Sequence, residues 1–307
     1  ENKSLGTIVA ISSYASYFWQ PIMNLGNIFN NFINNIAYLE RIFETIDEPV
    51  TVKDAEHAIE MPKIRGKVTF DHVTFAYDET KTILKDVSFT VNPGESVALV
   101  GPTGAGKSTI VNLISRFYNV NDGKVLIDDQ DIADVTIHSL RAQMGIMMQD
   151  SFIFSGTIAD NIRYGKLDAT QEEIEKAGKI VCADPFIREM PKGYETQVRE
   201  RGSMLSQGQK QLISFARTLL CDPAILILDE ATSSIDVQTE KALQTGLNRM
   251  LKGRTSFIIA HRLSTIRGCD KIMYIDDGGI AEAGTHEELM KKKGRYYKLY
   301  TAQKSLH

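Results

Sequence analysis

The chain has 307 residues, enough for one large domain or two ordinary ones. Its net charge of −4 provides no overall basic field, so the composition argues against nucleic acid as a partner. The cysteines Cys182, Cys221 and Cys269 lack the spacing of a metal site, and we expect them to be reduced, structural thiols of a cytosolic domain.

The first segment differs from the rest of the chain in its charge. Residues 4–39 contain no charged side chain, whereas 24% of the whole chain is charged. The stretch 5–23 is long enough to cross a hydrocarbon core of roughly 30 Å as a helix, although it is too polar for hydropathy alone to establish a span. A secretory signal peptide fits poorly, because a basic N-region and a small-residue cleavage site are missing. Since the chain begins with Glu1, we expect it to be a fragment of a longer protein.

The second half of this segment carries a stripe of uncharged polar side chains. They recur at three- and four-residue intervals, which places them on one face of a helix: Gln20, Asn24, Asn27, Asn31, Asn34 and Tyr38. Such a stripe suits a wet cavity or a helix–helix interface in a membrane. For the asparagines nearest Glu40, an equally open interpretation is that the stripe faces the cytosol. Pro21 predicts a kink unless neighbouring groups satisfy the freed backbone.

Charge returns at Glu40 and Arg41, and the helical pattern continues to Ile46 before Asp47-Glu48-Pro49 ends it. Residues 51–65 have the composition of an extended linker. We therefore predict three parts: a helical segment over 1–48, a linker over 49–66 and a folded domain over 67–307.

The new domain opens with strand patterns. Residues 67–77 alternate between apolar and polar side chains, and a second strand is predicted over 83–91. The turn residues 92–94 lead into the apolar run 96–100, a third predicted strand.

A glycine-rich stretch follows this third strand and precedes a helical pattern at 110–114. It consists of Gly101, Pro102, Thr103, Gly104, Ala105, Gly106, Lys107, Ser108 and Thr109. A strand, a glycine turn and a helix start form the context of the phosphate-binding loop. Glycines let the backbone wrap closely around a polyphosphate so that N–H groups point at its oxygens. Lys107 adds a positive charge for the outer phosphates and Ser108 a hydroxyl for Mg²⁺, so this pattern predicts binding of a nucleoside triphosphate.

Three later apolar runs each end in a residue able to do chemistry. The run 144–148 leads to Gln149, the run 224–228 to Asp229 and Glu230, and the run 255–260 to His261. Runs that are apolar throughout indicate strands covered on both faces, as in a parallel α/β sheet. Ligands bind at the carboxyl ends of such strands, so we expect these side chains to gather beside the glycine loop.

Transfer of a phosphoryl group to water assigns a role to each of these side chains. Asp229 is placed to hold Mg²⁺ together with Ser108, and Glu230 to activate the attacking water as a general base. Gln149 can sense the metal and the water through its amide, and His261 can hydrogen-bond the γ-phosphate and orient Glu230. The alternative for Glu230 is a charge at a helix N-terminus.

The stretch Leu205-Ser206-Gln207-Gly208-Gln209 stands immediately before a helical pattern over 210–220. Ser206 is a good helix cap, and the free N–H groups of a helix start favour a bound phosphate. In this order, after the glycine loop and before Asp229-Glu230, the chain resembles the ABC ATPases from about residue 67 to its end. The resemblance includes Tyr77, expected to stack on adenine, and residues 233–236, a D-loop ending in Asp236.

This resemblance implies a P-loop α/β fold with a mixed sheet core, an antiparallel β subdomain and a helical signature subdomain. It also implies MgATP as the ligand and a head-to-tail dimer. Ser206, Gly208 and Gln209 would then contact ATP bound by a partner chain, while Lys107 and Glu230 serve this chain's own ATP. Gln207 departs from the commonest form of the signature, as is often seen in exporters.

Residues 194–202 resemble the X-loop of exporters, and residues 152–158 match the region where intracellular helices of the membrane domain dock. Together with the charge-free segment, they suggest an exporter half-transporter whose residues 1–48 end the transmembrane domain with its last helix. The expected surroundings are a second half-transporter, identical or different, its own membrane domain, a lipid bilayer of the plasma membrane and an unidentified exported substrate. The ATPase domain would lie in the cytoplasm.

Other classes share parts of this pattern. A soluble ABC ATPase or an importer ATPase would have the nucleotide motifs without needing the charge-free helix. A non-enzymatic ATP-binding regulator would be expected to lack Glu230 or His261, and both are present.

Overall fold

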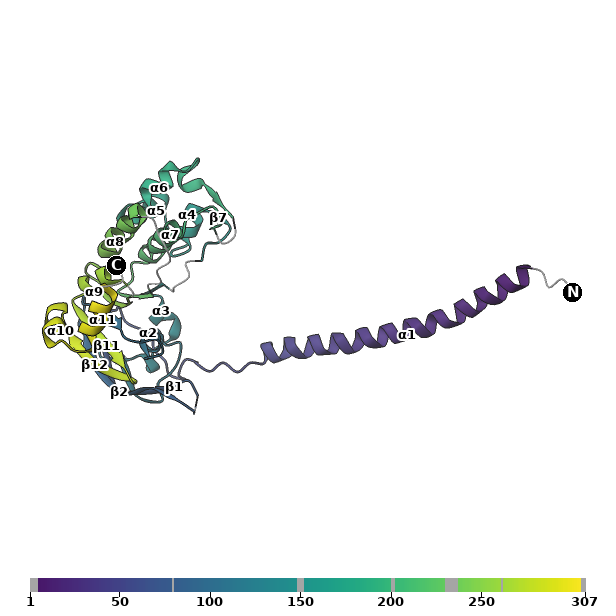
Figure 1. Ribbon diagram of the computed structural model, residues 1–307, viewed down its shortest axis with the longest axis horizontal. Coiled ribbons are helices and arrows are strands. Elements are labelled where there is room, and N and C mark those ends of the chain that lie inside the picture. Colours follow the sequence, from purple (N-terminus) through teal and green to yellow (C-terminus); the bar gives the residue numbers. More distant parts are fainter. Residues whose placement is uncertain are drawn as a thin grey trace. The chain divides into compact units, whose positions relative to one another are not determined.

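The computed structural model describes residues 5–78, 80–147, 152–199, 202–229, 237–260 and 262–304. The chain divides into two compact units, Glu1–Thr51 and Val52–His307. The first contains the helix α1 and the second all the remaining helices and strands (Figure 1).

Helix α1 (Leu5–Ile46) is 42 residues long and contains Pro21. It runs as one continuous, gently curved helix (Figure 1). All of its residues are exposed, including the polar stripe, in which Gln20 Nε2 donates to Asn24 Oδ1 at 3.3 Å. In the described part of the chain, no helix is both long and apolar enough to qualify as a membrane span.

The second unit is built on a six-stranded mixed sheet in the order β12-β11-β3-β10-β9-β6. Its strands are β3 (Ser96–Val100), β6 (Met144–Met147), β9 (Ile225–Asp229), β10 (Thr255–Ile259), β11 (Lys271–Asp276) and β12 (Gly279–Gly284). All neighbouring pairs are parallel except β11 and β12. Every residue of β3 and β10 is buried, because both faces of the sheet are covered. The predicted mixed α/β core is confirmed.

A four-stranded antiparallel sheet forms the second layer, in the order β2-β1-β4-β5. Its strands are β1 (Val68–Ala76), β2 (Thr82–Val91), β4 (Asp122–Ile127) and β5 (Gln130–Asp131). Phe70, Val87 and Val125 of this sheet share a buried apolar core with Leu99 of β3 and with α2 (Lys107–Ile114). The helix that follows the glycine loop is therefore fixed between two sheets.

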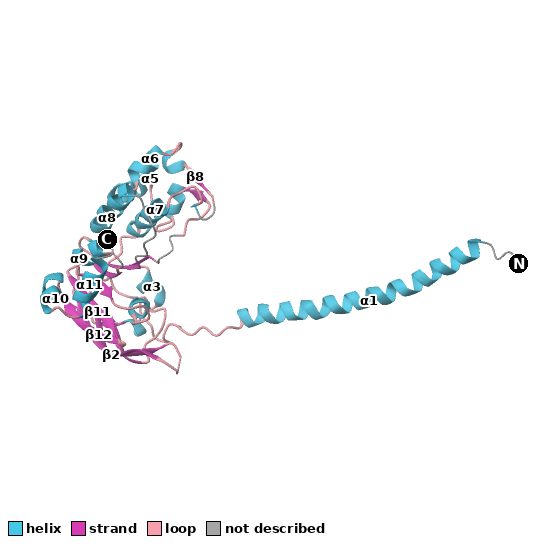
Figure 2. Ribbon diagram, in the orientation of Figure 1, coloured by secondary structure: helices cyan, strands magenta, loops and turns pink. Residues whose placement is uncertain are grey.

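A helical region makes up the third part, as Figure 2 shows by its colouring. It holds α4 (Ile158–Arg163), α5 (Gln171–Ile180), α6 (Asp184–Glu189), η2 (Gly193–Glu195) and α7 (Gln207–Leu220), with the short pair β7 (Gly156–Thr157) and β8 (Gln197–Val198). Helix α7 packs against α4, α5 and α8 (Val237–Leu251). The remaining elements are η1 (Ile132–Asp134), α3 (Ile137–Arg141), α9 (Leu263–Gly268), α10 (His286–Lys292) and α11 (Arg295–Lys304). The fold has the antiparallel and helical subdomains that the sequence predicted.

The segment that precedes β1 is hydrogen-bonded to the domain. The Ile59 N–H donates to Asp134 O at 3.0 Å, and the Met61 N–H donates to Ser139 Oγ at 2.7 Å. Gln143 Oε1 accepts from the Ile64 N–H at 2.8 Å. The extended chain from residue 52 is therefore held in register along η1 and α3.

Candidate functional site

The turn between β3 and α2 depends on three glycines with positive φ. Gly101, Gly104 and Gly106 have φ values of +138°, +80° and +106°. A Cβ on Gly101 would lie 2.1 Å from the Ile275 carbonyl oxygen, whereas a Cβ on Gly104 would meet nothing within 4 Å. Gly101 thus allows the loop to pass close to β11, and Gly104 lies at its open side. The N-cap of α2 is Gly106, which has no side chain to accept hydrogen bonds from the first N–H groups of the helix.

Lys107, the first residue of α2, folds back over this turn. Its Nζ donates to the carbonyl oxygens of Gly101 at 2.9 Å and Pro102 at 2.8 Å. Burial lowers the pKa of the half-buried ammonium, and the negative charge of Asp229 partly opposes that shift. The loop therefore encloses a cation bound to neutral oxygens, which an anionic ligand can replace. The next side chain, Ser108, is exposed.

Tyr77 lies over the start of α2. Its hydroxyl is 3.1 Å from Thr109 Oγ1, and its ring makes edge contacts with Phe75 and Tyr118, each with a centroid distance of 4.9 Å. The side chain is nevertheless 47% exposed. The ring of Tyr77, next to the glycine loop, is therefore both fixed in position and accessible to a ligand.

A cleft of about 520 Å³ adjoins the outer side of the loop. It is lined by Thr80, Lys81, Thr82, Ile83, Lys85, Pro102, Thr103, Gly104, Ala105, Asp276, Asp277 and Gly278. An ion pair of 2.8 Å between Lys85 Nζ and Asp277 Oδ1 connects two of its walls. Outside the glycine loop, sequence reasoning did not find the residues of this cleft, because they come from segments almost 200 positions apart that carry no motif.

The strands that precede the predicted catalytic positions lie side by side and parallel. Ile259 of β10 pairs with Leu99 of β3 on one side and with Asp229 of β9 on the other. On the other side of β9, Met147 of β6 pairs with Leu228 of β9. Gln149, Glu230, Asp236 and His261 themselves lie outside the described residues. The structure thus brings together the glycine loop, Lys107 and Asp229, and the roles of all these residues, described or not, stay predictions.

Ser206 is the N-cap of α7, as its sequence context predicted. Its Oγ accepts from the Gln209 N–H at 3.2 Å, and Gln209 Oε1 accepts from the Ser206 N–H at 3.0 Å. This capping box fixes the first turn of the helix. The Ser206 side chain is exposed, while Gly208 is buried.

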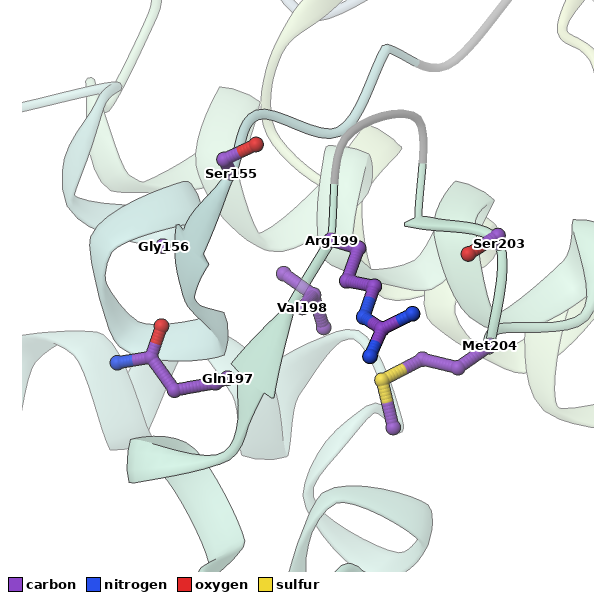
Figure 3. Close-up of a pocket in the computed structure, with 7 residues that line it drawn as sticks. All are labelled: Ser155, Gly156, Gln197, Val198, Arg199, Ser203 and Met204. Carbon is purple, nitrogen blue, oxygen red and sulfur yellow. The ribbon is translucent and has the colours of Figure 1, made fainter.

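The two stretches 152–158 and 194–202, which the sequence marked separately, meet in space. Gly156 pairs with Val198 and Thr157 with Gln197 in the small antiparallel sheet. A pocket of about 710 Å³ opens beside this pair, lined by Ser155, Gly156, Gln197, Val198, Arg199, Ser203 and Met204 (Figure 3). In that view the side chains of Arg199 and Met204 converge (Figure 3).

An exposed aromatic patch, formed by Phe152, Phe154 and Tyr164, lies beside this region, with exposed fractions of 46%, 39% and 59%. Arg217 of α7 holds it from beneath: Nε donates to Asn161 O at 2.8 Å and Nη1 to Phe152 O at 3.0 Å. The guanidinium carbon lies 5.5 Å from the Phe154 ring centroid and 5.8 Å from that of Tyr164. Arg217 is a residue that sequence reasoning missed, since its position within a helix does not show what it contacts.

Comparison with known proteins agrees with this architecture. Residues 84–233 match the ABC transporter domain family. An uncharacterized ABC transporter ATP-binding protein, YknV of Bacillus subtilis, is 50% identical over 99% of this chain and 50% of its own length. A putative multidrug export ATP-binding/permease protein of the same organism, YgaD, is 49% identical over 98% of this chain and 52% of its own length.

A fatty acid ABC transporter ATP-binding/permease protein of Mycobacterium bovis is 44% identical over 97% of this chain and 47% of its own length. Among solved structures, a bacterial Atm1-family ABC exporter with ATP bound matches 98% of this chain and 52% of its own, with a TM-score of 0.80 and 41% identity. The chain spans about half the length of these curated relatives.

Two of the three loop glycines, Gly101 and Gly104, make a matched pair for mutagenesis. Gly101→Ala and Gly104→Ala both force a side chain onto a positive φ, but only Gly101→Ala adds a clash with the Ile275 carbonyl. We expect Gly101→Ala to lower the free energy of unfolding by about 2 kcal/mol more than Gly104→Ala does. Urea denaturation of the two variants measures this difference. Equal losses would contradict the close approach of the loop to β11.

Proposed function

This chain belongs to the ABC transporter family, and we propose that it is the ATP-binding and ATP-hydrolysing part of an exporter. The observation that carries the proposal is the glycine loop after β3, in which two backbone carbonyls hold the ammonium of Lys107 at the start of α2. A phosphate chain in this loop would accept hydrogen bonds from the first N–H groups of α2 and from Lys107.

The ligand that fits is MgATP. Lys107 would exchange its bonds to Gly101 O and Pro102 O for charge-assisted bonds to the outer phosphates. Ser108 and Asp229 would hold Mg²⁺, which when bound neutralises phosphate charge. The exposed ring of Tyr77, whose hydroxyl lies beside Thr109 in the first turn of α2, would stack on adenine.

Hydrolysis requires groups beyond this binding site. Glu230, the residue after Asp229 at the end of β9, would take the proton of the attacking water. Gln149 and His261 follow β6 and β10 in sequence and would orient the water and the γ-phosphate. The support for this assignment is that β6, β9 and β10 are neighbours and parallel, so that their carboxyl ends share one edge.

The signature residues would act on a different ATP molecule. Ser206 presents an exposed hydroxyl at the start of α7, next to N–H groups of a helix terminus. In a head-to-tail dimer, Ser206, Gly208 and Gln209 would close over ATP held by the glycine loop of a second half-transporter. Asp236 would lie in the D-loop between the two sites. Binding would close the dimer, and hydrolysis would reopen it.

The coupling partner would be a transmembrane domain. We assign residues 1–48 to its end, with α1 as its last helix, residues 49–66 to the linker and residues 67–307 to the ATPase domain. The aromatic patch over Arg217 would receive the intracellular helices of that domain. The names of the relatives combine ATP-binding with permease or export, which favours an exporter over a soluble or importer ATPase. The full protein would then lie in the plasma membrane with this domain in the cytoplasm.

Glu230→Gln tests the enzymatic half of the proposal in the purified full-length protein. Removing a general base should lower the rate of ATP hydrolysis by at least about 100-fold, while MgATP still binds. Phosphate release gives the rate, and fluorescence titration with a labelled ATP gives the affinity. Lys107→Ala is the control, since it should weaken binding itself. Unchanged turnover in Glu230→Gln would remove Glu230 from the mechanism.

Tyr77 allows the stacking role to be separated from its hydrogen bond. Base–aromatic stacking contributes about 1–3 kcal/mol, so Tyr77→Ala should weaken MgATP binding by roughly 10-fold or more. Tyr77→Phe keeps the ring and loses only the hydroxyl, with its bonds to Thr109 and Asn112, and should bind MgATP within about twofold of wild type. If Phe and Ala weaken binding equally, the ring does not stack on adenine.

A further inference from the structure

Arg116 is a buried arginine just beyond the C-terminus of α2. Its residue is 2% exposed and its φ is +51°, so the chain leaves the helix in the left-handed region at this position. A guanidinium stays charged at all ordinary pH values, and burying it is costly unless hydrogen bonds and an opposite charge compensate. We therefore ask which hydrogen bonds and which opposite charge compensate the buried guanidinium of Arg116.

The partners of Arg116 include the segment that leads from α1 into the domain. Arg116 Nη2 donates to the Lys53 carbonyl oxygen at 3.0 Å, and Nη1 donates to that of Val135. A carboxylate oxygen, Asp54 Oδ1, lies 3.9 Å from Nη1 and also accepts from the Ile137 N–H at 2.8 Å. Arg116 thus ties two consecutive residues of the segment 52–65 to the end of α2.

A second arginine fixes the same helix end. Arg141 of α3 donates from Nε to Ser115 O at 3.0 Å and from Nη2 to Arg116 O at 2.7 Å. Its guanidinium carbon lies 4.6 Å from the Phe117 ring centroid. Burial and the nearby charge of Arg116 lower the pKa of Arg141, and Asp54 opposes this shift. The two carbonyls that follow α2 are therefore held by α3, to which the segment 52–65 is also hydrogen-bonded.

Helix α2 connects this cluster to the glycine loop. It begins at Lys107, and eight residues at 1.5 Å rise make it about 12 Å long. Most of its side chains are buried between the two sheets, so it moves as a rigid unit. A shift at its loop end would therefore reach Arg116 and, through Arg116, its partners Lys53 and Asp54, a few residues after the end of α1.

We propose that Arg116 is a positioning residue that couples occupancy of the glycine loop to the segment 52–65. The inference rests on the proposed binding of MgATP at that loop. It adds a route within one chain, from nucleotide to the residues that follow α1, which runs through neither the signature helix α7 nor the aromatic patch. Without this coupling, Arg116 would only anchor the segment, and nucleotide would leave the segment unchanged.

Amide hydrogen exchange of the 307-residue chain, with and without MgATP, tests the coupling. MgATP should slow exchange in the loop 101–109. It should also slow exchange at the hydrogen-bonded amides of Ile59, Met61 and Ile64 by about threefold or more. Arg116→Lys keeps the charge but replaces the planar fork by a single ammonium, which cannot hold both carbonyls in the same geometry. In this variant, the slowing of exchange that MgATP causes in residues 52–65 should fall by more than half. MgATP should still slow exchange in the loop 101–109.

Arg254→Gln provides the matched control. Arg254 is partly buried and, like Arg116, is bonded to a carbonyl and lies close to a carboxylate, those of Met250 and Asp222. Among the described residues, its hydrogen bonds and ion pair do not reach the segment 52–65. Its variant should keep the full slowing of exchange in residues 52–65. Arg116→Gln, where it folds, should abolish that slowing.

Two results would overturn the coupling while leaving ATP binding intact. In the first, MgATP does not slow amide exchange in residues 52–65 of wild type. In the second, MgATP slows that exchange in Arg116→Lys as much as in wild type. If MgATP does not protect the loop 101–109 of wild type, the proposed function fails first and the coupling fails with it.

Discussion

The arrangement of this domain depends on how the turn between β3 and α2 accommodates a cation. The Lys107 ammonium lies against the carbonyl oxygens of Gly101 and Pro102, inside a loop whose glycines let the backbone curve around it. The buried strand β3 fixes where the loop starts, and the buried face of α2 fixes where it ends. A loop held at both ends keeps its N–H groups in place, so phosphate binding need not order it.

Two helices that begin at candidate nucleotide-binding motifs each have an arginine, within the helix or just after it, that holds backbone carbonyls of another segment. Helix α2 starts at Lys107, and Arg116 just after it holds Lys53. Helix α7 starts after Ser206, and its Arg217 holds Phe152 and Asn161 beneath the aromatic patch. Arginine suits this task because its planar fork can bond two oxygens at once. The domain thus has two rigid connections from its candidate nucleotide contacts to the parts that we assign to communication with a membrane domain.

Much of the fold could be predicted because its strands are short, apolar and buried on both faces. Residues 96–100 form β3 as predicted, and β9 and β10 begin or end within one residue of the runs that indicated them. Ser206 was identifiable as a cap because a capping box is a local pattern. The packing of residues 52–65 could not be predicted, since Met61 and Ile64 bond to side chains almost 80 positions away. Arg116 was missed for the same reason: nothing near it in sequence shows that it is buried.

The central claim is that a complete ATP site needs the glycine loop of one chain and the signature of another. Lys107→Ala and Ser206→Arg, made separately in the full-length protein, should each abolish ATP hydrolysis. In a mixed dimer, the loop that carries Lys107→Ala faces the signature that carries Ser206→Arg, so both defects fall in one site. The other site combines an unchanged loop with an unchanged signature and is intact. Equal co-expression should therefore restore turnover to about a quarter of the wild-type rate, the share of intact sites among randomly paired chains. A mixture as inactive as either variant alone, with dimers formed, would contradict the shared site.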